Sequence, residues 1–200
     1  MKIFKALLAT ALITATLSAK TLKEGTLIIA TEGTYSPYSF YDEKNNLTGF
    51  DVDIPRALAK ELGLKAEFLT APWDAMLAAF DAGKADIAMN QVSITQERKK
   101  KYNFSEPYTV AYAALVVRAD NEEIKSFTDL KGKKSVHSAT SNWADMARNY
   151  GAEIVTADGF SKGVELIIAR RADATINDNI TFFDYMKQRP NAPLKIAAQG

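Results

Sequence analysis

Short β-rich runs alternate with longer segments of helical period along most of this chain, and this alternation constrains the fold most. Between the runs, apolar residues such as Ile54, Leu58 and Leu62 recur at the spacing of one helix face, with Pro55 suited to the first turn of that helix and Gly63 to its stop. The predicted strands are residues 26–30, 66–69, 86–89, 111–117, 135–137, 154–156 and 174–176. Such alternation is typical of parallel sheets covered by helices, so we expect an α/β fold.

Two similar strings suggest that the alternation has two halves. Residues 84–91 and 171–178 both read basic, Ala, Asp, three strand residues, Asn and a polar residue. So short a match indicates a repeat only weakly, and chance is an alternative. Ligands of open α/β sheets bind beyond the carboxyl ends of the strands, so both strings end where a ligand would lie, in one cleft if two lobes face each other.

The first nineteen residues have the form of a secretory signal peptide. Lys2 and Lys5 precede an apolar run over residues 6–17, and the small residues Ser18 and Ala19 follow it. The run is too short to span a bilayer, which takes roughly 20 residues. No cysteine follows Ala19, so we expect an exported protein without a lipid anchor there.

Charge and cysteine content exclude several function classes. The 25 basic and 24 acidic residues leave no excess for a nucleic acid or an anionic membrane. With no cysteine and one histidine, His137, the chain cannot build a thiolate metal site, a histidine metal cluster or a thiol nucleophile. We therefore expect no metal and no cofactor.

Arg98 is the first candidate for binding a charged ligand. It comes after the predicted strand 86–89, with Thr95 as a helix N-cap and the Ser93 hydroxyl nearby. A guanidinium can hold a carboxylate through two parallel charge-assisted bonds. The alternative is a solvated basic helix face, to which residues 99–101 are assigned.

Asp178 is the complementary candidate. It follows the predicted strand 174–176, where a carboxylate could accept hydrogen bonds from an ammonium group. The alternative is an N-cap for a helix beginning near Asn179. An arginine and an aspartate on facing lobes could recognise the two ends of a zwitterion as the lobes close.

Aromatic and acidic residues near the strand ends complete the part of the candidate site that the first half of the chain supplies. Tyr35 lies in a predicted loop and could wall a ligand, whereas Trp73 has the spacing of a core residue as well. Glu32 could accept from an ammonium group or be solvated. Asp51 and Asp53 open a helix and are assigned to its dipole rather than to a metal.

The second half offers small polar residues at a turn. Thr140, Ser141 and Asn142 could donate to a polar ligand or cap the helix that follows. His137 has no orienting partner in the sequence, although its side chain could reach the cleft.

Taken in order, the motifs resemble those of periplasmic solute-binding proteins of polar amino-acid ABC transporters, and most of all the cystine-binding branch. The motifs are TEGTYSPY (31–38), GFDVDI (49–54), LG (62–63), PWD (72–74), GKAD (83–86), TQER (95–98), FSEPY (104–108) and TSNW (140–143). The resemblance implies a two-lobe, type II periplasmic-binding-protein fold, each lobe a mainly parallel sheet flanked by helices. It places a signal peptide at 1–19, lobe 1 at 20–112, and lobe 2 with the start of the return to lobe 1 at 113–200.

The same resemblance implies roles for the candidate residues. Arg98 and Ser93, with Thr140 and Ser141, would bind the α-carboxylate, and Asp178 would bind the α-amino group. Tyr35 and Trp73 would form an aromatic sandwich. Side-chain specificity would be set by Glu32, Gln91, Asn142 and His137. The implied protein is a periplasmic monomer that delivers a polar amino acid, with L-cystine as one candidate, to a membrane permease.

One departure from the family pattern concerns the end of the chain. In the family the chain returns to complete the first lobe, whereas this sequence stops at Gly200. We therefore expect a fragment or a truncated form whose lobe 1 leaves apolar sheet exposed. Two other functions stay open: a cyclohexadienyl dehydratase on the same fold, with Glu32 as a possible acid, and a sensory domain, disfavoured because no membrane segment follows.

Overall fold

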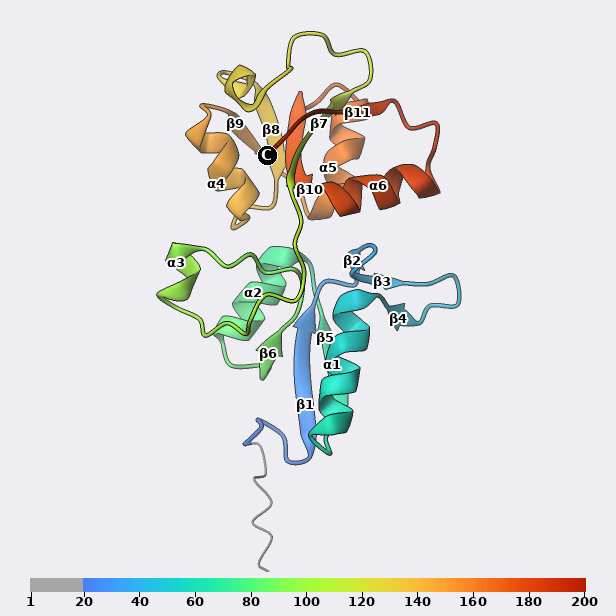
Figure 1. Ribbon diagram of the computed structural model, residues 1–200, viewed down its shortest axis with the longest axis vertical. Coiled ribbons are helices and arrows are strands. Elements are labelled where there is room, and N and C mark those ends of the chain that lie inside the picture. The colour runs from blue at the N-terminus through green and yellow to red at the C-terminus, as the bar shows by residue number, and fades with distance from the viewer. Residues whose placement is uncertain (1–19) are drawn as a thin grey trace, which may run out of the picture.

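The computed structural model describes residues 20–200 and has an α/β architecture, as the alternation predicts. The predicted signal peptide, residues 1–19, lies outside the described residues. Two units lie one above the other (Figure 1), which we name the lower unit, from β1 to α3, and the upper unit, from β7 to β11. The connecting segment, residues 100–112, joins them. No helix within residues 20–200 is long and apolar enough to cross a membrane.

The lower unit is built on a parallel sheet of order β5-β1-β6, with α1 and α2 on opposite faces. Ile29 packs in the cluster on the α1 side and its neighbour Ala30 in the cluster on the α2 side, because side chains alternate along a strand. Its elements are β1 (Thr26–Thr31), β2 (Thr34–Tyr35), β3 (Ser39–Tyr41), β4 (Leu47–Thr48), α1 (Phe50–Glu61), β5 (Lys65–Thr70), α2 (Trp73–Asp81), β6 (Ile87–Ala88) and α3 (Gln96–Lys99).

The upper unit is a five-stranded sheet of order β11-β7-β10-β8-β9, in which β7 runs antiparallel to both neighbours. Every residue from Ala113 to Val117 is buried, because helices and loops cover both faces of β7, which explains its uninterrupted apolar sequence. Its elements are β7 (Ala113–Arg118), the 3₁₀ helix η1 (Phe127–Leu130), β8 (Lys134–His137), α4 (Asn142–Asn149), β9 (Glu153–Thr156), α5 (Gly159–Ile168), β10 (Ala174–Asp178), α6 (Asn179–Gln188) and β11 (Leu194–Gln199).

The two similar strings occupy equivalent places in the two sheets. The Asp86 amide donates to the Ile28 carbonyl over 2.8 Å, and the Asp86 carboxylate accepts from the Ile28 amide over 2.7 Å. Asp173 makes the same pair of bonds with Lys134, both over 2.8 Å. In each unit the aspartate therefore ties the third parallel strand to the first.

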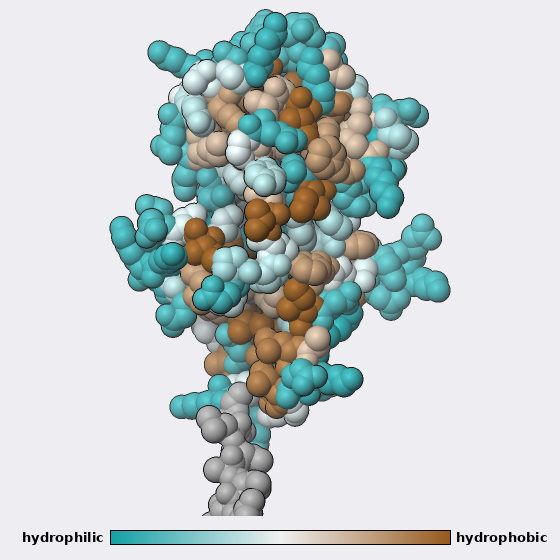
Figure 2. Space-filling model, in the orientation of Figure 1, coloured by the Kyte–Doolittle hydropathy of each residue, from teal (hydrophilic) through white to brown (hydrophobic). Residues whose placement is uncertain are grey.

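The helix α1 differs from the sequence prediction in two respects. It begins at Phe50, so Pro55 lies inside the helix and not in its first turn, whereas the predicted stop at Gly63, with φ +68°, is confirmed. Leu58 and Leu62, predicted on the buried face, are 42% and 49% exposed. Leu58 borders an apolar hollow of about 480 Å³ between α1, α2, β6 and residues 102–108, which leaves that end of the helix uncovered. Figure 2 shows hydrophobic residues gathered on this face of the lower unit.

Candidate functional site

A cavity of about 60 Å³ lies where the two units meet, which we call the interface cavity. Its walls combine strand ends and loops of the lower unit with the turn before α4 and the start of α5 in the upper unit. Seven of the candidates named from the sequence line it: Glu32, Tyr35, Trp73, Gln91, His137, Ser141 and Asn142. The carboxyl ends of β1, β8 and β10 converge here, as expected for a ligand site in open α/β sheets.

Glu32 follows the last residue of β1 and is only 6% exposed, so the solvated alternative does not hold. Asn90 fixes it from both sides: Nδ2 donates to Glu32 Oε2 over 2.6 Å, and Oδ1 accepts from the Glu32 amide over 2.8 Å. Burial outweighs these bonds and raises the pKa of Glu32 from its usual 4.5 to about 7. Near neutral pH this group can therefore accept a hydrogen bond or carry a proton.

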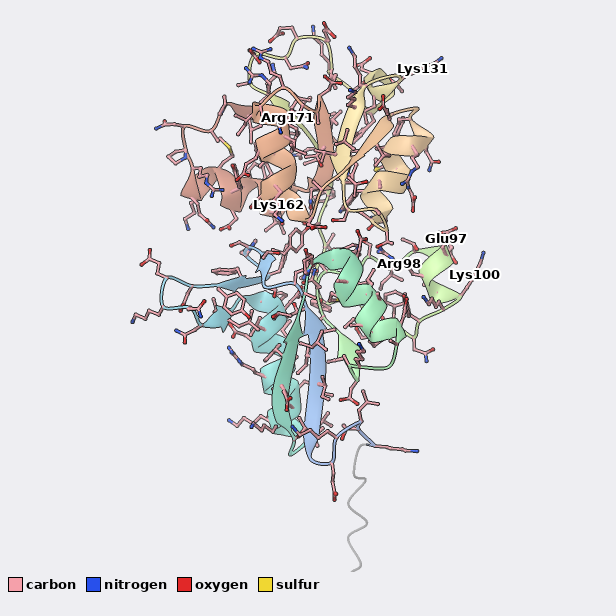
Figure 3. All side chains as sticks on the ribbon, turned by 180° about the vertical axis from the view of Figure 1, so that it is seen from behind. Glu97, Arg98, Lys100, Lys131, Lys162 and Arg171 are labelled. Carbon is pink, nitrogen blue, oxygen red and sulfur yellow. The ribbon has the colours of Figure 1, made fainter. Side chains whose placement is uncertain are left out.

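Arg98 is half-buried between the units and does not belong to a solvated basic face. Thr95 caps α3 by accepting from the Arg98 amide over 3.1 Å, as predicted. The guanidinium lies over the Trp73 ring, 5.3 Å from its centroid. Figure 3 shows Arg98 beside Glu97, at the end of the lower unit that faces the upper unit, with Lys100 farther out.

The guanidinium nitrogens of Arg98 bind three neutral oxygens, two of them in the upper unit. Nη1 donates to the Ser93 carbonyl and to Asn142 Oδ1, both over 3.2 Å, and Nη2 donates to the Thr140 carbonyl over 3.4 Å. These bonds are long for a charged donor. A carboxylate brought between the units would be a stronger acceptor than any of the three.

Asp178 has the helix-cap role that the sequence allowed, and its carboxylate also accepts hydrogen bonds from the other unit. It caps α6, accepting from the Thr181 amide over 2.7 Å and from Thr181 Oγ1 over 3.0 Å, and it accepts two further bonds from the lower unit. Tyr35 Oη and Tyr38 Oη both donate to its carboxylate, the second over 3.3 Å. Burial and the neighbouring Asp178 raise the pKa of Tyr35, so its hydroxyl stays protonated and donates.

A second cavity, of about 320 Å³, adjoins the first on the side of the connecting segment, and we call it the hinge cavity. Tyr35, Gln91 and Trp143 line both cavities, whereas Ser93 and Asp178 line only the hinge cavity. Arg98 and Thr140 line neither cavity, because they are engaged with each other across the interface.

The turn before α4 places Ser141 as the helix cap that the sequence allowed, with its Oγ accepting from the Trp143 amide over 3.1 Å. His137, just before this turn, is 6% exposed, and burial lowers its pKa to about 3, so the ring is neutral. Its Nε2 lies 2.8 Å from Ser135 Oγ. Sequence reasoning missed this partner, although residues two apart on a strand share a face.

Asp51 and Asp53 both lie in the first turn of α1, as assigned, but Asp51 does more than complement the helix dipole. Asp53 is exposed, in agreement with that role, but Asp51 is fully buried and accepts from Gln91 Nε2 over 2.8 Å and from Tyr108 Oη over 3.0 Å. Burial raises its pKa to about 6. Asp51 therefore holds Gln91 and the connecting segment in place. No cluster of three or more metal-ligating side chains occurs in the part of the chain that the structure describes.

The arrangement suits a ligand of mixed charge better than a reaction. A cationic group, Arg98, and an anionic group, Asp178, come from different units. Asp178 lines the hinge cavity, and Arg98 lies over Trp73, which lines the interface cavity. Trp73 and Tyr35 add flat apolar surface between them. Such a site can bind both ends of a small zwitterion.

Residues 27–191 match the family of bacterial extracellular solute-binding proteins, family 3. A probable amino-acid ABC transporter-binding protein of Haemophilus influenzae is 49% identical over 175 residues, covering 88% of this chain and 68% of that protein. The L-cystine-binding protein TcyA of Bacillus subtilis is 40% identical over 176 residues, covering 88% and 65%. The chain thus spans about two thirds of the length of these relatives.

The solved structure of an ancestral arginine-binding protein bound to arginine is similar to this chain, with a TM-score of 0.81 and 39% sequence identity. The match covers 88% of this chain and 80% of that one. The expected type II periplasmic-binding-protein fold is confirmed by this likeness. All three matched proteins are binding proteins and not enzymes, which favours a site without catalysis.

Proposed function

The chain belongs to the bacterial extracellular solute-binding proteins, family 3, and from that premise we propose that it binds a free polar amino acid between its two units, with L-cystine as the first candidate. It then delivers the ligand to the membrane permease of an ABC transporter. The observation that carries the proposal is the placement of Arg98 and Asp178, of opposite charge, on different units beside the shared cavities.

The ligand enters when the units separate. The interface cavity holds about 60 Å³, far below the roughly 300 Å³ at which small-molecule pockets begin. On closure, the α-carboxylate replaces the weak carbonyl partners of Arg98, with Ser93, Thr140 and Ser141 nearby, and the α-ammonium donates to Asp178. Because the two groups come from different units, the ligand favours the closed state over the open one.

Cystine is the first candidate because it is a two-headed zwitterion that can extend from one cavity into the other. The interface and hinge cavities share Tyr35, Gln91 and Trp143, so a ligand with one head in the first cavity could place its other head in the second. Glu32, His137 and Asn142 line the interface cavity, where they would select the ligand side chain. The arginine-binding likeness makes L-arginine the main competitor, since Glu32 could accept from a guanidinium.

The location of the protein is the next part of the proposal. We propose that residues 1–19 act as a cleavable signal peptide and that the product works in the periplasm, without a lipid anchor, as a monomer. Residues 20–112 form lobe 1 and residues 113–200 form lobe 2 of this protein.

Calorimetric titration of the protein against L-cystine, L-arginine and the other polar amino acids tests the proposal. Saturable binding of one or a few of them is expected. Removal of one partner of a buried charge pair typically costs about 2–5 kcal/mol, so Arg98→Ala weakens binding at least about thirtyfold. Asp178→Asn, which keeps the helix cap, weakens it comparably, whereas Lys99→Ala on the exposed side of α3 leaves it unchanged. Absence of binding across the panel would overturn the proposal.

A dehydratase is the second candidate because Glu32, with a pKa of about 7, lies in the interface cavity where it could donate a proton. Incubation with prephenate decides between the two. The binding protein leaves prephenate unchanged, and product formation abolished in Glu32→Gln would favour the enzyme.

A further inference from the structure

We propose that Asp74 is a latch that holds the two units closed independently of the ligand. The inference deepens the proposed function, on which its consequence for ligand release rests, but closure itself is testable without ligand. Asp74 lies in the first turn of α2, in the lower unit. The turn that it contacts, residues 138–141, precedes α4 in the upper unit.

Three hydrogen bonds converge on the Asp74 carboxylate. The Ala139 amide donates to Oδ2 over 3.0 Å, the Thr140 amide donates to Oδ1 over 2.9 Å, and Thr140 Oγ1 donates to Oδ1 over 2.5 Å. All three donors belong to the upper unit, more than sixty residues away in the sequence. Both carboxylate oxygens are used, as in the binding of an anion by backbone amides.

Neighbouring contacts align the turn with the latch. Trp73 Nε1 donates to Thr140 Oγ1 over 3.0 Å, which leaves the hydroxyl proton of Thr140 free to donate to Asp74. Ser138 Oγ anchors the other end of the turn, donating to the Ala157 carbonyl over 3.3 Å. The amides of residues 139 and 140 therefore face α2 in a fixed geometry.

Asp74 itself is separate from the ligand-facing surface, although its donor Thr140 also lies near the proposed carboxylate site. Asp74 lines neither the interface cavity nor the hinge cavity, and its acceptor atoms bind protein donors only. Arg98 and Asp178, by contrast, have partners that a zwitterion would replace. Asp74 consequently acts as a positioning residue: it stabilises the closed arrangement with or without ligand and slows ligand escape.

Asp74→Asn is the informative variant, because an amide nitrogen would face the N–H and O–H groups from which the carboxylate now accepts hydrogen bonds. We expect the ratio of closed to open molecules to fall about tenfold, which corresponds to about 1.4 kcal/mol. Asp53→Asn is the matched control, since Asp53 is also acidic and in the first turn of its helix, but is exposed and contacts only Arg56. Circular dichroism checks the fold of each variant.

Spin-label distances read closure directly, because the chain has no native cysteine. Cysteines replace the exposed Lys99 and Asn149, one in each unit, and the label distance is measured without ligand. We expect a short distance for the parent and for Asp53→Asn, and a longer one for Asp74→Asn. If Asp74→Asn does not fold, Asp74→Glu, which keeps the charge on a longer arm, gives a smaller shift in the same direction.

Identical distance distributions for the parent and the folded Asp74 variants would overturn the latch. A second readout is the dissociation rate of L-cystine or L-arginine, whichever binds, which rises about tenfold in Asp74→Asn. If no amino acid of the panel binds, the proposed function fails, and the ligand-free distances still decide whether the latch exists.

Discussion

Glu32→Gln isolates the free energy that is stored in one buried carboxyl group at the centre of the site. Glu32 is 6% exposed and its pKa lies at about 7, against 4.5 for the group in water. One pKa unit corresponds to about 1.4 kcal/mol, so ionising Glu32 in the folded protein costs about 3 kcal/mol more than in the unfolded chain.

The sign of the pH dependence follows from the direction of this shift. Between pH 4.5 and 7 the folded protein binds more protons at Glu32 than the unfolded chain does. Its contribution to stability is therefore fully present below pH 4.5 and is lost as the pH rises through 7. In Glu32→Gln this position cannot ionise, so the variant does not lose this contribution to stability as the pH rises.

Urea denaturation of both proteins at pH 4.5, 6 and 8.5 measures the effect. The free energy of unfolding of the parent minus that of Glu32→Gln should fall by about 3 kcal/mol over this range. Titration of other groups, such as Asp51 with a pKa of about 6, cancels in the difference. A constant offset from the changed bonds to Asn90 does not matter, since only the slope is tested.

Glu61→Gln serves as the control, because Glu61 is exposed at the end of α1 and its difference from the parent should stay flat with pH. If the difference in unfolding free energy between the parent and Glu32→Gln is also independent of pH, the reasoning that burial sets the proton affinity of Glu32 is refuted.

Three further predictions concern buried residues of the upper unit and of its contact with the lower unit. Burial lowers the His137 pKa to about 3, so the parent should lose on the order of 5 kcal/mol of stability as the pH falls from 6.5 toward 3, and His137→Asn should not. Acid titrations followed by circular dichroism measure this loss. The same dependence of stability on pH in both proteins would contradict the prediction. Tyr35→Phe should lower the free energy of unfolding by about 1–3 kcal/mol in urea, because Asp178 and Asn177 lose their shared donor; an unchanged midpoint would count against that bond. Ile176→Ala, at a fully buried position of β10, should cost about 2–5 kcal/mol in the same assay, and a smaller loss would mean that the core there repacks.

The strands and helix faces of this protein were predictable because burial leaves a periodic record in the sequence. The run in β7 is apolar throughout since both faces of the strand are covered. All seven predicted strands have bounds within two residues of those observed for β1, β5, β6, β7, β8, β9 and β10. Capping by Thr95 and Ser141 was predictable too, because a cap is a local interaction.

Contacts between distant segments were not predictable from spacing. Asp51 looked like a partner of its helix dipole, but the fold brings Gln91 and Tyr108 onto its carboxylate. Asp74 carried no signal at all, because its three donors lie in the other unit. Arg98 was identified as a candidate, yet its present partners Asn142 and Thr140 depend on how the units meet.

Recognition of both ends of a zwitterion by Arg98 and Asp178 is the central claim, and ligand analogues test it without changing the protein. The measurement is a calorimetric comparison of the amino acid that binds with its decarboxylated amine: cystamine for L-cystine, or agmatine for L-arginine. The amine lacks the carboxylate that Arg98 would hold, so the account predicts affinity at least about thirtyfold weaker for it. Equal affinity for the amino acid and its amine would contradict the claim.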